Sequence, residues 1–428
     1  MTVLAVWRDA RRVGVLDTTP NGDVRFTYDA EVVAEARPEF AVGFKCPVRA
    51  KPYTGLEAAA IFENLLPEGT LRSTLGQATK HDPSDTVGLL GVVGGECAGA
   101  LQLWPEGESP PLKAEYDDVS ASALSVAFTS AGGQLRQVTG RASLSGAQPK
   151  LALWRMPPVG GEHPAYRLPR NGAPTTVVVK RPGQDFPGLL EAEMVGMRLM
   201  QSAGVETASS APCAVATDCH ESARFDRVVT PEGHVQRRHA EDGCQLTGRL
   251  SRNKYAKLNA PTYLDLCAVL NRASTNPLED REFLFRWAMA NAAMGNYDAH
   301  AKNISVVYVT PDRVRLAPAY DVVVTAVYED LDHDFALHFG GTTLPQALLR
   351  ASLRVAAREF SLPAARVTEV AEDVVQLVRS SLPDVLQQVS RIGGEPEMLD
   401  KLSASVLKTS SALAERLGMA RHDAARAS

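Results

Sequence analysis

The sequence lacks the patterns that mark zinc-bound, disulfide-bonded or membrane-spanning proteins. Its six cysteines are scattered along 428 residues and none forms a C-x-x-C pair, so we expect free thiols rather than a zinc site or a disulfide framework. None of the nine histidines belongs to an H-E-x-x-H motif, which excludes that class of metallohydrolase. No run approaches the roughly 18 apolar residues of a membrane span, and no signal peptide follows Met1. We therefore expect a cytoplasmic protein that does not insert into membranes.

An excess of basic residues is also absent. The 45 Lys and Arg are outnumbered by 50 Asp and Glu, for a net charge of −5, and this argues against DNA binding through the overall electrostatic field. Two local basic clusters, 237–239 and 249–257, are candidates for phosphate or partner contacts, although such runs are more often solvated loops. The content of hydrophobic residues, 45%, allows a chain of this length to bury about two or three cores.

The distribution of apolar residues predicts an α+β fold in three parts. Residues 1–105 read as a small antiparallel sheet with helices, and a proline-containing linker follows at 105–111. Residues 119–225 combine strands with one long helix, whereas residues 226–428 are largely helical. The runs that indicate strands in the first part are 4–7, 12–16 and 24–28, and those that indicate helices in the last part by three- and four-residue spacing are 266–272, 281–294, 364–379, 383–391 and 398–417.

One stretch carries groups at a spacing used in phosphoryl transfer. Asp298 is followed five residues later by Asn303, and a second carboxylate, Asp321, comes after two apolar runs. Transfer of phosphate from ATP uses one Asp to orient or receive the attacking hydroxyl, and an Asn and a second Asp to bind the magnesium that bridges the phosphates. The runs at 304–309 and 314–316 predict a hairpin, which would bring Asn303 and Asp321 to the same end.

Taken alone, an Asp and an Asn at this spacing more often form a turn or cap a helix. Two further features favour a functional role. The apolar, alanine-rich run at 281–294 predicts a helix that delivers the motif from a buried position. His300 and Lys302 add polar groups that a plain turn does not require.

Upstream, a run of small residues predicts a phosphate-binding loop. Small side chains let backbone amides approach phosphate oxygens closely. The loop contains a single glycine, so a simple hairpin turn is the alternative interpretation. Its residues are Ser145, Gly146, Ala147 and Gln148, and they stand just before Lys150.

A second upstream feature is a strand that ends in a lysine. Residues 175–179 form a β-branched run followed by Lys180, and a lysine at the end of a buried strand is costly unless it is paired or reaches a ligand. The helix predicted at 189–200 offers Glu193 as its partner, with Glu191 as the competing choice. A strand lysine paired with a helix glutamate is the arrangement that orients ATP phosphates in kinases.

Taken in order, these segments resemble the HipA family, bacterial serine/threonine kinases that are the toxin halves of toxin–antitoxin pairs. The resemblance implies a bilobal protein-kinase-like fold, with a small N-terminal β-rich subdomain, a kinase small lobe and a mostly helical C-terminal lobe. The similarity runs nearly end to end, and its matching segments are 53–55, 62–68, 145–150, 224–227, 241–245, 298–303 and 318–321.

The resemblance also implies roles for individual residues. Asp298 resembles the catalytic base, and Asn303 and Asp321 resemble magnesium ligands. Ser143 resembles the serine at which family members autophosphorylate, with Ser145 as the competing acceptor. A departure is the proline at 149, where we expect a charged residue. The residues implied to contact ATP are Ser145, Gly146, Ala147, Gln148, Lys150, Lys180, Glu193, Ala223, Phe225, His300 and Lys302.

The function implied by the resemblance is that of a growth-arresting protein kinase that uses ATP and Mg²⁺. Its substrate would be a protein, with aminoacyl-tRNA synthetases among the family's targets. Its partner would be a small helix-turn-helix antitoxin (HipB-like), so that contact with DNA is only indirect. Two alternatives stay open: a catalytically idle co-repressor that binds the antitoxin, and a small-molecule phosphotransferase.

Overall fold

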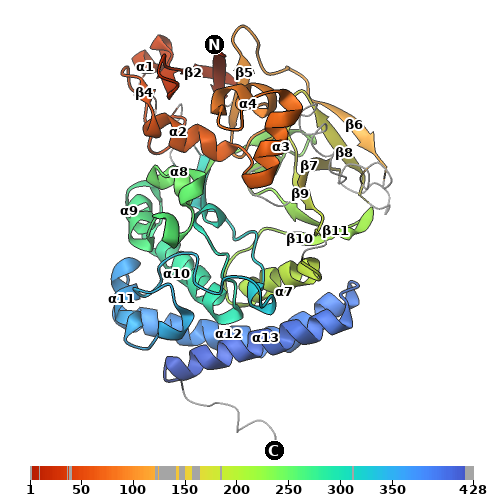
Figure 1. The fold of residues 1–428 in the computed structure, drawn as a ribbon, viewed down its shortest axis with the longest axis vertical. Coiled ribbons are helices and arrows are strands. Elements are labelled where there is room, and N and C mark those ends of the chain that lie inside the picture. Colours follow the sequence, from red (N-terminus) through yellow and green to blue (C-terminus); the bar gives the residue numbers. More distant parts are fainter. Residues whose placement is uncertain are drawn as a thin grey trace, which may run out of the picture. The chain divides into compact units, whose positions relative to one another are not determined.

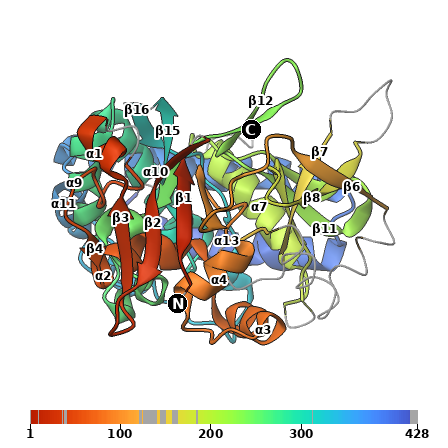
Figure 2. The ribbon, with the colours of Figure 1, turned by 90° about the horizontal axis from the view of Figure 1, so that it is seen from above.

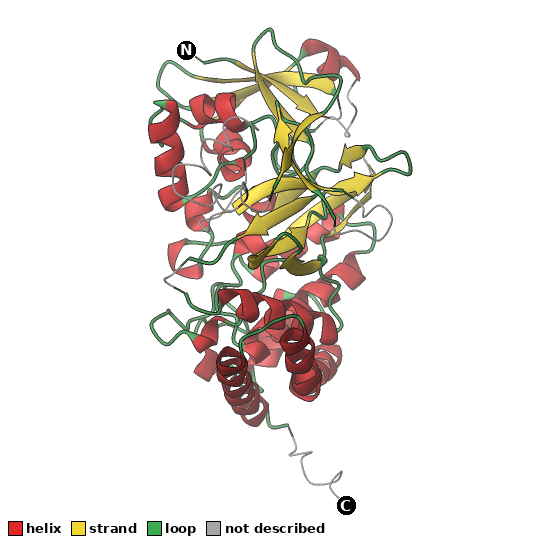
Figure 3. Cartoon of the chain, turned by 90° about the vertical axis from the view of Figure 1, so that its right-hand side faces the viewer, coloured by secondary structure: helices red, strands yellow, loops and turns green. Residues whose placement is uncertain are grey.

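The computed structural model describes residues 2–8, 10–35, 37, 41–120, 124, 141–143, 150–156, 164–183, 186–310 and 313–419. The chain folds into two compact units, each built from several separate stretches. Every described strand belongs to unit 1, and the described elements of unit 2 are helices, apart from isolated bridges such as that of Phe339 with Thr342. Figure 3 distinguishes the helices from the strands by colour. The predicted α+β class is confirmed, while the three-part division 1–105, 119–225 and 226–428 stays a prediction. Unit 1 comprises Met1–Pro187, Ala208–Asn253 and Ser305–Ala317, and unit 2 comprises Gly188–Thr207, Lys254–Ile304 and Pro318–Ser428.

The N-terminal part of unit 1 is an antiparallel sheet covered by short helices. Its strands run in the order β4-β3-β2-β1-β5, and β3, β2 and β1 lie side by side in Figure 2. Phe26 packs on Phe62 with 5.3 Å between ring centroids, in a core that also buries Leu4, Leu16 and Ile61. The three strands predicted in this part are confirmed. The elements are β1 (Leu4–Arg8), β2 (Arg11–Thr18), β3 (Val24–Tyr28), β4 (Tyr53–Thr54), β5 (Leu101–Pro105), α1 (Ala30–Glu35), α2 (Leu56–Phe62), α3 (Gly69–Thr79) and α4 (Thr86–Val93).

A second antiparallel sheet of unit 1 has the order β10-β11-β9-β7-β8-β6. Its β-branched and leucine residues alternate inward, and Leu151, Leu153, Val177 and Val179 are all buried in one cluster. The strands are β6 (Glu115–Val119), β7 (Lys150–Arg155), β8 (Tyr166–Arg170), β9 (Val177–Lys180), β10 (Ser210–Cys213) and β11 (Ala216–Ala223).

Two smaller sheets complete unit 1. One is the ribbon of β12 (Arg227–Val229) and β13 (Val235–Arg237). The other has the order β14-β15-β16, with the strands Ala240–Asp242, Ser305–Thr310 and Arg313–Leu316. The antiparallel pairing of β15 with β16 confirms the hairpin predicted between the catalytic motif and the second carboxylate. Helix α8 (Gly243–Thr247) follows β14 and begins with a capping box of Asp242 and Gln245.

A buried ionic network joins the N-terminal part of unit 1 to the strands that follow. Glu96, which is 0% exposed, accepts hydrogen bonds through Oε1 from Arg224 Nη1 at 2.9 Å and Arg227 Nη2 at 3.0 Å. Its Oε2 accepts from Arg237 Nη2 at 2.7 Å. Asp226 accepts from Arg224 Nη2 and from Arg227 Nη1, both at 2.7 Å. Three guanidinium groups and two carboxylates therefore share one largely buried cluster.

Mutual pairing keeps the carboxylates of this cluster ionised. Burial by itself raises the pKa of Glu96, but Arg227, Arg237 and Arg224 lower it to about 2. Burial also opposes ionisation of Asp226, and Arg224 and Arg227 hold its pKa well below the ordinary value. Because removal of one partner leaves uncompensated charge in a low-dielectric interior, the members stabilise the fold only as a set.

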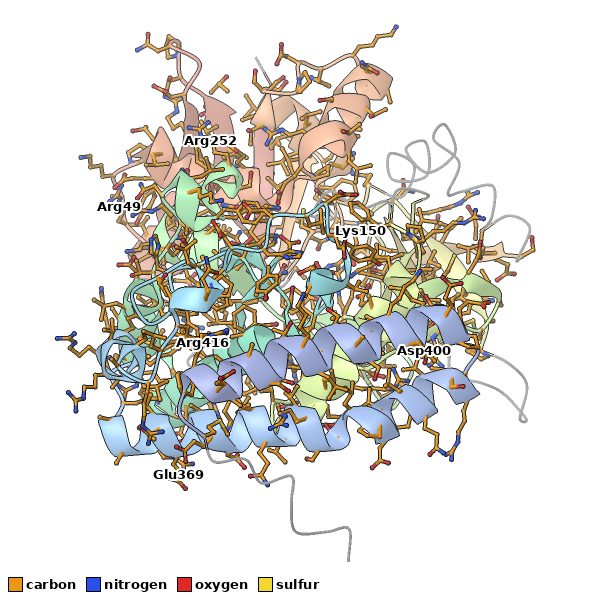
Figure 4. The ribbon with its side chains drawn as sticks, turned by 60° about the horizontal axis from the view of Figure 1, so that its bottom comes forward. Arg49, Lys150, Arg252, Glu369, Asp400 and Arg416 are labelled. Carbon is orange, nitrogen blue, oxygen red and sulfur yellow. The ribbon has the colours of Figure 1, made fainter. Side chains whose placement is uncertain are left out.

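Unit 2 is a group of helices packed around α10 (Pro277–Met294). This helix buries most of its residues, and many of them are alanine, so neighbouring helices can approach it closely. Helices α12 and α13 pack on it and run alongside each other in Figures 1 and 4, where Glu369 marks α12 and Asp400 marks α13. The other helices are α7 (Leu189–Ser202), α9 (Tyr263–Ala273), α11 (Ser352–Glu359), α12 (Ala364–Arg391) and α13 (Pro396–Arg416).

The prediction of two separate helices at 364–379 and 383–391 is wrong, because α12 runs continuously through Pro383. A proline inside a helix removes one backbone hydrogen bond and crowds the carbonyl of the preceding turn. Pro383 is exposed, so that carbonyl can bond to water, and the buried Leu382 and Val385 continue the apolar face across the proline. Packing of this face outweighs the local cost.

The six cysteines are free, as predicted, and all six are buried. Burial is the main cause that raises the pKa of the Cys97 and Cys267 thiols to about 12. Such thiols are poor nucleophiles. No helix in the described part of the chain is long and apolar enough to cross a membrane.

The ionic network predicts a large effect of neutralising its central carboxylate. Glu96→Gln should lower the free energy of unfolding by about 3–5 kcal/mol, because three arginines lose the charge that compensates them. Urea denaturation measures the change. The matched control is Glu106→Gln in the same unit, whose partner is Arg12 and whose side chain is 44% exposed; it should change stability by less than about 1 kcal/mol. Equally small effects of both substitutions would contradict the account.

Candidate active site

The loop that carries the predicted catalytic motif begins where α10 ends. Gly295 closes the helix in the left-handed region, with φ of 78°, and a Cβ on it would lie 2.5 Å from the Ala326 Cβ, so glycine is required here. The Thr325 hydroxyl accepts from the Tyr297 N–H at 2.7 Å and lies 3.2 Å from the Gly295 carbonyl oxygen. The side chain of Asn296 donates to Asn291 Oδ1 at 2.8 Å. These bonds fix the loop to the helix that precedes it and to the segment of Thr325.

Asp298 and Asn303 are joined within this loop. The carbonyl oxygen of Asp298 accepts from the His300 N–H at 2.8 Å and from Asn303 Nδ2 at 3.1 Å. Asn303 is only 6% exposed, whereas the side chain of Asp298 is exposed. The amide of Asn303 is thus oriented by the backbone beside the carboxylate, and its Oδ1 is the atom that a hard cation would bind.

Asp321 has a backbone conformation that few non-glycine residues adopt. Its φ is 58°, in the left-handed region, which costs an Asp roughly 1 kcal/mol or more. Such residues concentrate at functional sites, where the surrounding structure holds them in place. Tyr320 donates to the carbonyl oxygen of Lys302 at 2.6 Å. Since Tyr320 adjoins Asp321 and Lys302 adjoins Asn303, this bond joins the segments of the two predicted magnesium ligands.

His300 is neutral at physiological pH. It is 7% exposed, and burial, with the nearby charges of Lys254 and Lys302, lowers its pKa to about 3, against the opposing effect of Asp321. Lys302 is also buried, at 6% exposed. The site therefore combines a neutral imidazole with one buried ammonium group.

The donor set fits magnesium. An amide oxygen from Asn303 and a carboxylate from Asp321 are hard ligands, and Mg²⁺ in phosphate-binding sites takes one or two such protein ligands and fills its other positions with phosphates and water. Among the described residues no cluster of three or more His, Cys, Asp or Glu could hold a metal ion.

In unit 1, Lys180 lies at the end of β9 beside two other basic residues. It pairs with Lys150 of β7 and with His220 of β11, and residues directly opposite in antiparallel strands point to the same face. Lys180 is 6% exposed and His220 is 1% exposed. Two lysines and a histidine thus lie on one face of this sheet. Glu193 and its competitor Glu191 lie on α7 in unit 2, so the pairing of Glu193 with Lys180 stays a prediction.

The predicted phosphate loop is described only at its edges. Ser145, Gly146, Ala147 and Gln148 lie outside the described residues. Ser143 is 1% exposed, its hydroxyl donates to the Leu65 carbonyl oxygen at 2.5 Å, and its N–H donates to the Glu96 carbonyl oxygen at 2.8 Å. The candidate phosphorylation site is therefore attached to the residue at the centre of the ionic network.

The same network fixes the predicted adenine-binding segment. The Ala223 N–H donates to Ser209 at 2.7 Å. Phe225 stands between Arg224 and Asp226, whose side chains are both anchored in the Glu96 cluster. The residues on either side of Phe225 are thus anchored by ion pairs of their side chains.

Two contributors were not predicted from the sequence. Glu96 is 128 residues from Arg224 along the chain, and no local pattern indicates this pairing. Tyr255 lies inside the basic cluster 249–257, and its hydroxyl donates to Asp298 Oδ1 at 2.6 Å. The basic cluster indicated that this segment makes phosphate or partner contacts, but its lysines and arginines, and not the tyrosine, were the expected contact residues.

Comparisons with known proteins identify relatives over most of the chain. The chain matches the HipA N-terminal domain over residues 4–104 and the HipA-like C-terminal domain over residues 142–382. It is 35% identical over 347 residues to putative kinase Y4mE of Sinorhizobium fredii, covering 79% of this chain and 81% of that one. It is 26% identical over 361 residues to serine/threonine-protein kinase toxin HipA of Shewanella oneidensis, covering 76% and 77%.

Among solved structures, it is similar to a chain of the Shewanella oneidensis MR-1 complex of HipA, HipB and operator DNA. The TM-score is 0.81 at 20% identity, covering 97% of this chain and 98% of that chain. This match shows the fold, and it confirms the predicted kinase-like architecture of the HipA type.

The geometry around Asp321 predicts a loss of phosphate transfer when its charge is removed. Asp321→Asn should lower the rate of ATP-dependent transfer at least about 100-fold, because a charged magnesium ligand is lost. Thermal unfolding should change little, since asparagine also tolerates the left-handed backbone. Asp330→Asn, at an exposed position of the same unit, is the control. Near wild-type turnover of the Asp321 variant would make Asp321 a structural turn residue.

Proposed function

The chain belongs to the HipA family, and from this premise we propose that it is an ATP-dependent serine/threonine protein kinase that arrests growth as a toxin. The observation that carries the proposal is the arrangement in unit 2. There the amide of Asn303 is bonded to the backbone of Asp298. Asp321 has a left-handed backbone, and its neighbour Tyr320 is bonded to Lys302, the neighbour of Asn303. Relatives named as kinases support it further.

Each residue of the site then has a chemical task. ATP with bound Mg²⁺ supplies the phosphoryl group when it is present. Asp298 orients the acceptor hydroxyl and takes its proton. Asn303 and Asp321 hold the metal.

The remaining polar residues bind and orient the nucleotide. Lys180 and Lys150 bind phosphate oxygens, with Glu193 as the proposed partner of Lys180. His300, which stays neutral, contributes hydrogen bonding without charge, and Lys302 adds a cation. The other proposed contacts are the backbone of Ala223 and Phe225 around adenine, and the loop residues Ser145, Gly146, Ala147 and Gln148 around the phosphates.

We further propose a protein acceptor in translation, such as an aminoacyl-tRNA synthetase, and a small helix-turn-helix antitoxin of the HipB type as the partner. The solved complex similar to this chain contains HipA, HipB and operator DNA, which supports a partner of this kind. DNA contact would then be indirect, through the antitoxin. The net charge of −5 agrees with that assignment.

Labelled ATP distinguishes this proposal from its two alternatives. Purified protein incubated with [γ-³²P]ATP and a bacterial lysate should label a protein band. A catalytically idle co-repressor would give no turnover, and a small-molecule phosphotransferase would label only small molecules. Either of these results would contradict the proposal.

Asp298→Asn tests the role of the catalytic carboxylate in the same assay. The variant should bind ATP as tightly as the wild type and lose transfer, because the carboxylate serves the incoming hydroxyl rather than the nucleotide. Isothermal titration with ATP and Mg²⁺ measures the affinity. A loss of affinity as large as the loss of rate would count against this role.

A separate prediction concerns Ser143 as a self-inactivation switch. Its hydroxyl is buried and bonded to Leu65, so phosphorylation requires the segment to leave this place. The phosphate adds roughly −1.5 to −2 charges. A buried dianion with no proton to donate cannot return beside the Leu65 carbonyl oxygen, so the modified segment stays displaced and activity falls. After incubation with ATP, mass spectrometry should find phosphate on Ser143 in the wild type and none in Asp298→Asn.

The matched control is Ser143→Ala, which should keep its activity during preincubation with ATP while the wild type loses it. Phosphate on Ser145 instead of Ser143 would show that the competing acceptor is the site of self-inactivation. An unmodified loop in an enzyme that phosphorylates other proteins would refute it.

A further inference from the structure

The basic cluster at 249–257 contains one residue that touches the catalytic loop directly. Tyr255 donates its hydroxyl to Asp298 Oδ1 at 2.6 Å, and both residues belong to unit 2. A hydrogen bond to an ionised carboxylate is shorter and stronger than one between neutral groups. The proposed catalytic carboxylate is thus held by a phenol from a segment about forty residues earlier in the chain.

The backbone around Tyr255 is fixed on both sides. The carbonyl oxygen of Lys254 accepts from the Ala301 N–H at 3.2 Å, within the catalytic loop, and the Ala256 N–H donates to the Ala336 carbonyl oxygen at 2.7 Å. Tyr255 itself accepts from the Leu258 N–H at 2.8 Å, in the short turn that follows. The backbone next to Tyr255 is therefore bonded to the loop that carries Asp298.

The ring of Tyr255 is fixed as well. It meets the His300 ring edge-on, with 5.2 Å between centroids and an interplanar angle of 78°. The Nζ of Lys254 lies 5.3 Å from the ring centroid, within the range of a cation–π contact. With backbone and ring both held, the hydroxyl is already oriented toward the carboxylate, and little further conformational entropy is lost when the bond forms.

An exposed aspartate needs such a restraint if it is to act on a hydroxyl in one defined direction. The side chain of Asp298 is exposed, and hydrogen bonds of its backbone with Asn296, His300 and Asn303 fix the main chain. The bond from Tyr255 to Oδ1 restricts the orientation of the carboxylate. Misplacement of a catalytic group by even 1 Å can cost roughly 100-fold in rate.

We infer that Tyr255 is a positioning residue that orients Asp298 for the acceptor hydroxyl. This inference rests on the proposed function, because it assigns Tyr255 to the same transfer reaction. Tyr255 acts through Asp298 and does not bind the nucleotide. Its absence should therefore reduce the rate of transfer and leave the binding of ATP as it is.

The test is Tyr255→Phe, which keeps the ring on His300 and removes only the hydroxyl. Steady-state transfer from [γ-³²P]ATP is measured to dephosphorylated casein, to the chain itself and to water. We expect kcat to fall about 10- to 100-fold, with the KM for ATP within about twofold of the wild type and an unchanged thermal midpoint.

The matched control is Tyr297→Phe. Tyr297 adjoins Asp298, but its hydroxyl bonds to Thr409 instead of the carboxylate, so kcat should stay within about twofold of the wild type. Wild-type kcat in Tyr255→Phe overturns the inference, and so does a change confined to KM or an equal loss in both variants. If the wild type transfers no phosphate to any acceptor while it binds ATP, the proposed function fails and the role of Tyr255 fails with it.

Discussion

The buried carboxylate of Glu96 is the constraint on which unit 1 depends. Its side chain compensates Arg224, Arg227 and Arg237, and its backbone holds the segment at 141–143 through two hydrogen bonds. A buried ion pair stabilises only when every charge has its partner, so the N-terminal sheet, the segment before the phosphate loop and the segment at 223–225 are tied to one another through one residue. The segment proposed to bind adenine and the proposed phosphorylation site, Ser143, therefore both depend on contacts with Glu96.

Unit 2 holds the polar groups of the candidate site, buried ones such as Asn303 and the exposed Asp298, in fixed positions. The loop after α10 achieves this with hydrogen bonds from the Tyr297 N–H to the Thr325 hydroxyl and from the Asn303 amide to the backbone carbonyl of Asp298. Asp321 adds a left-handed backbone that the fold maintains at a cost. Tyr255 supplies the restraint on the carboxylate itself. Preorganisation of this kind is what a transfer reaction needs, because the enzyme then spends no energy on arranging its groups during the reaction.

The sequence predicted elements whose signal is local. The runs at 4–7, 24–28 and 304–309 form strands, and the segments at 281–294 and 398–417 with apolar residues at helical spacing form helices. Periodicity and propensity agree in these segments. Pro383 misled the prediction of α12, since buried packing on both sides outweighs one lost hydrogen bond. Helix α3 went unpredicted because its Gly and Thr residues have weak helix propensity. Short motifs were enough to select Asp298, Asn303 and Asp321, but the partners that orient them are distant in sequence and no pattern of a single chain indicates them.

The central claim is that Asn303 and Asp321 hold the metal of a nucleotide-dependent phosphotransferase, and one diffraction measurement tests it directly. Crystals grown with Mn²⁺ and a non-hydrolysable ATP analogue should give an anomalous peak within about 2.5 Å of both Asn303 Oδ1 and the Asp321 carboxylate. The account predicts that this peak also contacts the phosphates of the analogue. An analogue bound with its metal at other residues, or a bound analogue that leaves Asn303 and Asp321 without metal, would contradict it.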